Sequence, residues 1–252
     1  MNLFSLEGKT AVVTGASRGL GQAMAIALAK AGAQVVCSSS REGGCSQTVS
    51  GIEALGRNAW DIPANLTERE AIDRFVHTVF STVEEVHILV NNAGTITRHP
   101  AHEYPLDEWD MVLQVNLSSL FHLCQSFGAP MLERKSGKII NTASLLTFSG
   151  GITVPAYAAS KHGVAGVTKA LANEWAAHNV QINAIAPGYF RTDNTQALQD
   201  NPVRNEQIQG RIPAGRWGEP DDLGGAAVFL ASAASDYVNG HVLTVDGGWM
   251  AR

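Results

Sequence analysis

A tyrosine and a lysine four residues apart form the most reactive pair in the sequence. In Tyr157-Ala-Ala-Ser-Lys161 the two side chains share one face of an expected helix, because residues i and i+4 of a helix are neighbours. A phenol has a reference pKa near ~10, and a fixed positive charge beside it favours the phenolate. A tyrosine tuned in this way can pass a proton to or from a substrate oxygen. Ser144 directly follows an expected strand, and its hydroxyl could donate to the same oxygen.

A glycine cluster near the N-terminus could hold a phosphate group. The stretch Thr14-Gly-Ala-Ser-Arg-Gly-Leu-Gly21 follows an expected strand at 10–14 and precedes an Ala-rich helix expected at 22–31. Gly15 would form the tight turn, Gly19 would let the backbone approach a pyrophosphate, and Gly21 would let the helix lie close to the sheet. The N-terminus of that helix adds N–H donors and the positive end of a dipole. We therefore expect a nucleotide here, although the spacing is not G-x-G-x-x-G.

The end of the second expected strand indicates which nucleotide is preferred. Dinucleotide-binding folds that choose NAD usually place an Asp or Glu there to bind the ribose. The region here reads Cys37-Ser-Ser-Ser-Arg41 and contains no acid. Arg18 and Arg41 could both face a 2′-phosphate, with help from the hydroxyl of Ser39 or Ser40. These residues favour NADP(H) slightly.

The elements that must position these groups alternate as strand, helix, strand, helix. Their apolar runs are mostly continuous, as in strands covered on both faces. The pattern predicts an α/β architecture: a single-domain Rossmann fold over residues 1–252, with a doubly wound parallel sheet of about seven strands. The expected strands are 10–14, 34–37, 58–62, 87–90, 138–140, 180–185 and 241–245, and the main crossover helices are 107–135 and 156–177.

Further polar features fall where such a fold would bind a ligand. Asn91-Asn92-Ala93-Gly94 follows the fourth strand, which neighbours the first strand in the usual order, so this turn should line the cofactor crevice. Asn116 lies in a helix interior, where its side chain competes with backbone hydrogen bonds, so it either has a function or faces solvent. The polar segment 189–215 is longer than a usual connection, and we expect it to be a lid over the crevice.

The composition excludes several classes of function. The 252 residues are 45% hydrophobic and 16% charged with a net charge of −5, which suits a globular core and offers no basic footprint for nucleic acid. No stretch approaches the ~18 apolar residues of a membrane span, and the N-terminus shows no signal peptide. Neither the three cysteines nor the eight histidines have metal spacing. We expect a cytoplasmic protein with no metal, no nucleic-acid partner and no membrane association.

Together these motifs resemble the short-chain dehydrogenase/reductase family over nearly the whole chain. The resemblance implies that Tyr157 is the general acid/base and that Ser144 orients and polarises the reacting C–O group. Lys161 would lower the pKa of Tyr157 and bind the nicotinamide ribose. Asn116 would anchor a water that links Lys161 to a proton relay. The family also implies a homotetramer that pairs through helices, and the small residues of 156–177 would permit such pairing.

The same resemblance implies a nicotinamide cofactor site. Pro187, Gly188 and Thr192 would hold the carboxamide side of the nicotinamide. The family usually places an Asp after the third strand to face the adenine amine. Asn65 stands there instead, and its carbonyl can still accept that hydrogen bond beside the backbone of Leu66. The expected cofactor-binding residues are Gly15, Ser17, Arg18, Gly19, Leu20, Gly21, Ser39, Arg41, Asn65, Leu66, Asn92, Ala93, Gly94, Tyr157, Lys161, Pro187, Gly188 and Thr192.

Several stretches resemble a narrower group within this family, the dehydrogenases of 2-keto-3-deoxygluconate and 2-deoxygluconate. They are 149–157, 170–175, 193–196, 211–218 and 246–252. The resemblance implies an oxidoreductase acting on a sugar-acid hydroxyl or ketone. Members of that group are commonly NAD-linked, whereas the arginines favour NADP, so NAD(P) stays open. The alternatives are a reductase of another carbonyl substrate, such as a 3-oxoacyl thioester, and a catalytically silent dinucleotide-binding regulator.

A sugar acid carries a carboxylate, so its pocket should offer a cation. Arg98 is the first candidate, because it follows the cofactor turn by four residues. A planar guanidinium can bind a carboxylate with two hydrogen bonds. Further candidates in or near segment 189–215 are Arg191, Arg211 and Arg216. The expected substrate contacts are Arg98, Ser144 and Tyr157.

Overall fold

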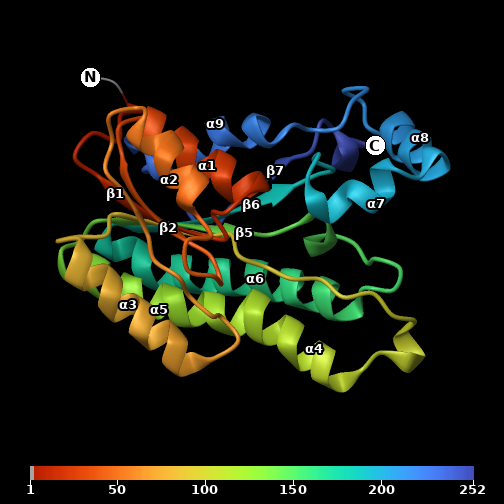
Figure 1. Cartoon of the computed structure of the whole chain (residues 1–252), viewed down its shortest axis with the longest axis horizontal. Coiled ribbons are helices and arrows are strands. Elements are labelled where there is room, and N and C mark those ends of the chain that lie inside the picture. Colours follow the sequence, from red (N-terminus) through yellow and green to blue (C-terminus); the bar gives the residue numbers. More distant parts are fainter. Residues whose placement is uncertain (1–2) are drawn as a thin grey trace.

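The computed structural model describes residues 3–252 and contains one seven-stranded sheet (Figure 1). Its order is β3-β2-β1-β4-β5-β6-β7, and every neighbouring pair is parallel. This order confirms the predicted doubly wound sheet, with the reversal of strand order between β1 and β4. The strands are β1 (Thr10–Thr14), β2 (Gln34–Ser38), β3 (Ala59–Asp61), β4 (Ile88–Asn91), β5 (Gly137–Thr142), β6 (Val180–Pro187) and β7 (Val242–Val245).

Helices connect the strands and cover both faces of the sheet (Figure 1). The α-helices are α1 (Gly19–Lys30), α2 (Ser46–Glu53), α3 (Arg69–Thr82), α4 (Leu106–Leu113), α5 (Ser119–Glu133), α6 (Pro155–Trp175), α7 (Gln196–Gln199), α8 (Pro202–Arg211) and α9 (Gly224–Ala231). A π-helical turn spans Gln114–Ser118. Short 3-10 helices span Ala101–Glu103, Leu145–Thr147, Ala176–His178, Asp193–Thr195, Pro220–Leu223, Ala233–Ser235 and Trp249–Ala251.

Alternate residues of each strand enter two different hydrophobic layers. In β1, Val12 packs with the layer that contains α3, α5 and α6, whereas Ala11 and Val13 pack with the layer that contains α1 and α9. All three side chains are fully buried. Burial on both faces explains why the strands read as continuous apolar runs, because neither face can be polar.

The structure differs from the expected helix ranges at two places. α1 begins at Gly19, so the last glycines of the cluster already belong to the helix. The helix expected over 107–135 is interrupted by the π-helical turn between α4 and α5. Asn116 sits in this turn and is buried, because its side chain bonds to another loop of the chain. Single π-helical turns are frequent at functional sites.

Three further features concern membrane-spanning helices, metal ligands and thiols. No helix within residues 3–252 is long and apolar enough to cross a membrane. The same residues contain no group of three or more His, Cys, Asp or Glu side chains that could hold a metal ion. Three cysteines are present as buried free thiols: Cys37, Cys45 and Cys124.

Candidate active site

Hydrogen bonds join the turns that follow β1 and β4, where the strand order reverses. The Asn92 side-chain amide donates to the carbonyls of Thr14, at 3.0 Å, and Gly15, at 3.1 Å. The Thr14 hydroxyl accepts the backbone N–H of Asn92 and of Ala93, each at 3.0 Å. Thr14 therefore fixes the crevice in which such folds bind their ligands. The sequence analysis missed this role, although a hydroxyl at the end of a buried strand was a visible signal.

The glycine turn fits a pyrophosphate. Gly15 and Gly19 have φ values of +65° and +57°, a backbone region that favours glycine. A Cβ at Gly21 would lie 2.1 Å from the Gly15 carbonyl oxygen, so α1 could not approach the sheet as closely with any other residue. Arg18 at the N-cap makes no side-chain cap, and the first turn of α1 carries no acid. The backbone N–H groups at the N-terminus of α1 are therefore suited to bind an anion.

The other residues expected at the cofactor lie along the same sheet edge. Ser17 and Leu20 are half-buried in the glycine turn, and the exposed Gly94 ends the β4 turn. After β2, the Ser39 hydroxyl donates to the Arg41 carbonyl at 3.0 Å. After β3, Leu66 is buried while Asn65 is exposed.

The side chain of Asn65 is already engaged in its own turn. Its carbonyl oxygen accepts the Thr67 backbone N–H at 3.1 Å and the Thr67 hydroxyl at 2.8 Å. Its amide donates to Glu68 at 2.9 Å. The predicted contact of this carbonyl with an adenine amine would therefore compete with the Thr67 bonds.

Beyond β6, the chain turns back toward the glycine cluster. The Gly188 N–H donates to the Val245 carbonyl at 2.8 Å, directly after Pro187 ends β6. The γ-methyl of Thr192 lies 3.5 Å from the place of a Cβ on Gly19. Arg18 Nε lies 3.1 Å from the Asp193 carboxylate, with both side chains 71% exposed. The start of segment 189–215 thus lies against the glycine turn.

The structure brings Ser144 and Tyr157 together. Ser144 begins a 3-10 turn after β5, where its hydroxyl accepts the Leu146 N–H at 3.2 Å. Tyr157 is half-buried in the first turn of α6. Desolvation by burial raises the pKa of Tyr157, whereas a hydrogen bond with Ser144 and the positive charge of Arg98 act to lower it.

Lys161 is buried between the Tyr157 ring and the end of β5. Its ammonium lies 5.5 Å from the centroid of the Tyr157 ring and donates to the Thr142 carbonyl at 2.6 Å. Desolvation by burial lowers the pKa of Lys161 to about 8. The positive charge of Arg98 also acts to lower the pKa of Tyr157, the effect that the resemblance assigns to Lys161.

Asn116 connects α6, through Ser160, to the loop after β4. Its carbonyl oxygen accepts the Thr95 N–H at 2.8 Å, and its amide donates to the Thr95 carbonyl at 2.9 Å. The same amide donates to the Ser160 hydroxyl at 3.1 Å. These bonds exclude the alternative that Asn116 faces solvent. Ser160 was missed from the sequence, although it directly precedes Lys161.

A buried chain of polar side chains also escaped the sequence analysis. The Asn91 amide donates to Asn141 at 3.0 Å, and the Asn141 amide donates to the Thr168 hydroxyl at 3.0 Å. This chain of hydrogen bonds links β4, β5 and α6. Because buried polar groups cost free energy unless they are paired, these bonds specify one arrangement of the three elements.

The candidate arginines for a substrate carboxylate differ in what they already bind. Arg191 pairs with Glu219 at 3.1 Å, and the Arg211 guanidinium stacks 4.0 Å from the centroid of the Trp249 ring. Arg98 is exposed, and within residues 3–252 it forms no ion pair. Its positive charge acts to lower the pKa of Tyr157. Arg98 is therefore the candidate that combines an available guanidinium with proximity to the Tyr157 phenol.

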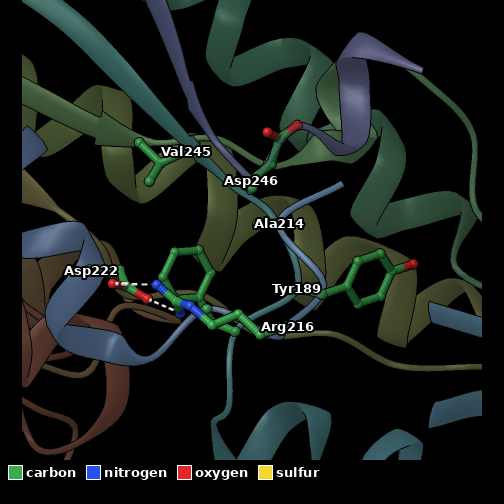
Figure 2. A pocket seen from close by; sticks show the side chains of 9 residues that line it. Tyr189, Ala214, Arg216, Asp222, Val245 and Asp246 are labelled. Atoms are coloured by element: carbon green, nitrogen blue, oxygen red, sulfur yellow. Dashed lines mark hydrogen bonds and ion pairs between the residues drawn. The ribbon is translucent and has the colours of Figure 1, made fainter. Parts of the chain in front are cut away.

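Arg216 belongs to a separate pocket of about 150 Å³ beside the carboxyl ends of β6 and β7 (Figure 2). Its guanidinium donates to both Asp222 carboxylate oxygens, at 2.6 and 3.0 Å. This pairing holds the pKa of Asp222 below its usual range. Figure 2 shows the Tyr189 phenol turned away from the pair. Since Arg216 is neutralised, the pocket presents no available guanidinium.

Known proteins resemble this chain over nearly its whole length. A family model described as enoyl-(acyl carrier protein) reductase matches residues 15–250. The chain is 55% identical over 249 residues to a 2-dehydro-3-deoxy-D-gluconate 5-dehydrogenase of Bacillus subtilis (strain 168), an alignment that covers 99% of this chain and 97% of the relative.

Two solved structures extend the comparison. A protein named provisionally as a 2-deoxy-D-gluconate 3-dehydrogenase of Agrobacterium tumefaciens, with bound NADP, is 51% identical with a TM-score of 0.93, covering 100% of both chains. A gluconate 5-dehydrogenase of Burkholderia cenocepacia J2315, in complex with NADP and tartrate, is 37% identical with a TM-score of 0.95. That match covers 100% of this chain and 98% of the other.

Proposed function

Because the chain belongs to the short-chain dehydrogenase/reductase family, we propose that it oxidises a sugar-acid hydroxyl, or reduces the corresponding ketone, with a nicotinamide cofactor. The substrate is of the 2-keto-3-deoxygluconate or 2-deoxygluconate type. The observation that carries this proposal is that Arg98, which has no ion-pair partner among the described residues, lies beside the hydrogen-bonded Ser144 and Tyr157. A guanidinium can hold the carboxylate while the phenol exchanges a proton with the reacting oxygen.

The proposed chemistry divides among four side chains. Tyr157 exchanges the proton with the reacting oxygen; burial raises the pKa of its phenol, and the hydrogen bond with Ser144 and the charge of Arg98 act against that shift. Ser144 orients and polarises the same oxygen. Lys161 binds the nicotinamide ribose, and Asn116 fixes the loop and helix that carry these groups. When bound, a nicotinamide cofactor supplies or accepts the hydride.

The cofactor site is proposed to run along the carboxyl ends of β1 to β4 and β6. The glycine turn and the free N-terminus of α1 support pyrophosphate binding there. The ion pair of Arg18 with Asp193, which joins segment 189–215 to the glycine turn, supports a lid function for that segment. The NADP in both crystallised relatives agrees with the preference that Arg18 and Arg41 suggest.

Arg18→Ala should raise the KM for NADP about tenfold, because a charge-assisted contact to the 2′-phosphate is lost. The KM for NAD should stay unchanged, since NAD lacks that phosphate. Asp193→Asn is the matched control: it removes the partner of Arg18 and leaves the guanidinium available. Steady-state kinetics with both cofactors measure the effect. An unchanged ratio of the KM for NADP to the KM for NAD in Arg18→Ala would show that Arg18 does not bind the 2′-phosphate.

Arg98→Ala should raise the KM for a sugar acid about tenfold, through loss of a hydrogen-bonded charge. The KM for the corresponding sugar-acid amide should change little, because the amide offers no anion. Arg74→Ala, which removes an exposed arginine of α3, controls for the change in net charge. Equal effects of Arg98→Ala on acid and amide would refute carboxylate binding at this position.

The substrate class is tested by initial rates on a defined panel. The panel contains 2-keto-3-deoxygluconate, 2-deoxygluconate and an acetoacetyl thioester, each with NAD(H) and NADP(H). Turnover of a sugar acid supports the proposal. Turnover of the thioester alone would favour the alternative, a 3-oxoacyl thioester reductase, which is the activity named for a solved structure 31% identical to this chain.

We further propose a cytoplasmic homotetramer whose subunits are single domains over residues 1–252. The single sheet, which joins strands from Thr10 to Val245, supports one domain. The buried free thiols suit a reducing compartment. The outer face of α6 supports helix pairing between copies, because Ala159, Gly166 and Ala170 are small and exposed there.

A further inference from the structure

The loop of residues 95–105, which carries Arg98, is attached to the catalytic elements at two points. Thr95 is held on both its N–H and its carbonyl by Asn116, in the π-helical turn before α5. The His99 N–H donates to the Thr153 carbonyl at 3.0 Å. Thr153 lies between Ser144 and Tyr157 in the chain and has a φ of +64°. Arg98 therefore lies next to the point where the loop meets the segment that joins the two catalytic hydroxyls.

Side chains within and beside this loop add a second set of contacts. His99 Nε2 lies 3.0 Å from a Glu108 carboxylate oxygen on α4, and both side chains are about one-third exposed, at 36% and 33%. The His99 ring packs edge-on against Tyr104, with centroids 5.4 Å apart. Tyr104 packs against Trp109 and hydrogen-bonds to Thr97. The residues on both sides of Arg98 are thus fixed, whereas the Arg98 side chain itself is exposed and forms no ion pair with any residue from 3 to 252.

We propose that His99 and Glu108 are positioning residues whose hydrogen bond holds the 95–105 loop so that Arg98 faces the carboxylate of the bound sugar acid. This inference rests on the proposed function, in which Arg98 binds that carboxylate. A bidentate contact requires the guanidinium to lie within a narrow range of positions, so a small displacement of the loop weakens binding. Neither His99 nor Glu108 needs to touch the substrate for this effect.

The loop contains a matched control pair. His102 Nε2 lies 3.2 Å from Glu103, but these side chains are 80% and 69% exposed. Glu103→Gln removes the same kind of histidine–carboxylate contact from the same loop. It should leave the KM for the sugar acid unchanged, because both side chains of this pair are mostly exposed and joined to each other within the same loop.

The experiment is a double-mutant cycle between Arg98 and the proposed positioning pair. Glu108→Gln and His99→Gln should each raise the KM for the sugar acid about fivefold, with kcat and the KM for the sugar-acid amide unchanged. In an Arg98→Ala background, the same changes should have no further effect on the KM for the acid. Thermal unfolding of each variant identifies any loss of fold. If one of Glu108→Gln and His99→Gln does not fold, the other still tests the proposal.

The outcomes separate the two levels of the proposal. If Arg98→Ala does not discriminate acid from amide, the proposed carboxylate site fails, and the positioning role fails with it. If Arg98→Ala discriminates but Glu108→Gln raises the KM equally with and without Arg98, the positioning role is overturned and the carboxylate site stands. An effect of Glu103→Gln as large as that of Glu108→Gln would also overturn it.

Discussion

Replacing Tyr157 by Phe should lower kcat by about 10²–10⁴-fold, the usual contribution of a positioned general acid or base. The ring would keep its place in the first turn of α6, while the proton donor that hydrogen-bonds with Ser144 would be lost. Binding of NADPH should stay close to that of the wild type, because the phenol oxygen contributes to proton transfer. Stopped-flow or steady-state kinetics together with a cofactor titration measure both quantities.

Tyr237→Phe is the matched control, since Tyr237 is fully exposed and far from the site in the chain. It should leave kcat unchanged. A Tyr157→Phe variant that keeps more than a tenth of the wild-type kcat would show that another group moves the proton. Loss of NADPH binding in that variant would assign Tyr157 to cofactor binding instead.

Lys161→Met should abolish most activity and at the same time stabilise the fold at neutral pH. Burial lowers the pKa of Lys161 from 10.5 to about 8, which corresponds to a cost of about 3 kcal/mol for keeping the buried cation charged. Methionine removes that cost, but leaves the Thr142 carbonyl without its donor, a loss of about 1 kcal/mol. We expect the free energy of unfolding to rise by about 2 kcal/mol at pH 7.

The sign of the pH dependence follows from the direction of the Lys161 shift. Between pH 8 and 10.5 the unfolded chain holds more protons on this group than the folded chain, so raising the pH stabilises the wild type relative to Lys161→Met. The advantage of the variant is therefore complete below about pH 8 and disappears toward pH 10.5. Urea unfolding of both proteins at pH 7 and pH 10 measures this difference. A variant less stable than the wild type at pH 7 would contradict the buried-cation account.

The strands and the two ligand turns could be predicted from the sequence because their signals are local. Val12, Val36 and Leu89 lie in continuous apolar runs, since both faces of the sheet are covered. Gly15 adopts a positive φ that favours glycine, and Gly21 leaves no room for a Cβ beside the Gly15 carbonyl. Such requirements act within a few residues, so the local sequence pattern predicts these strands and turns.

The features that sequence reasoning missed depend on contacts between distant parts of the chain. The interruption of the expected helix 107–135 follows from the bonds of Asn116 to Thr95 and Ser160, which are 21 and 44 residues away. The pairing of Arg18 with Asp193 likewise depends on how segment 189–215 folds back. No local sequence pattern predicts that these distant residues come into contact.

The electrostatics of the site illustrate the same limit. The spacing of Tyr157 and Lys161 predicts a shared helix face, and the cation–ring distance of 5.5 Å agrees with it. The direction of the Lys161 ammonium is set by the Thr142 carbonyl at the end of β5, which the spacing does not reveal. Likewise, only the folded chain distinguishes Arg98 from Arg191 and Arg216, whose charges are already paired.

The most direct test of the account follows a hydrogen isotope from substrate to cofactor. The protein is incubated with NADP and a sugar acid that carries deuterium on the carbon of the reacting hydroxyl, and the reduced cofactor is analysed by mass spectrometry. The account predicts one deuterium in each NADPH formed, at a rate that Tyr157→Phe nearly abolishes. NADPH without deuterium, or deuterated NADPH formed as fast by Tyr157→Phe as by the wild type, would contradict it.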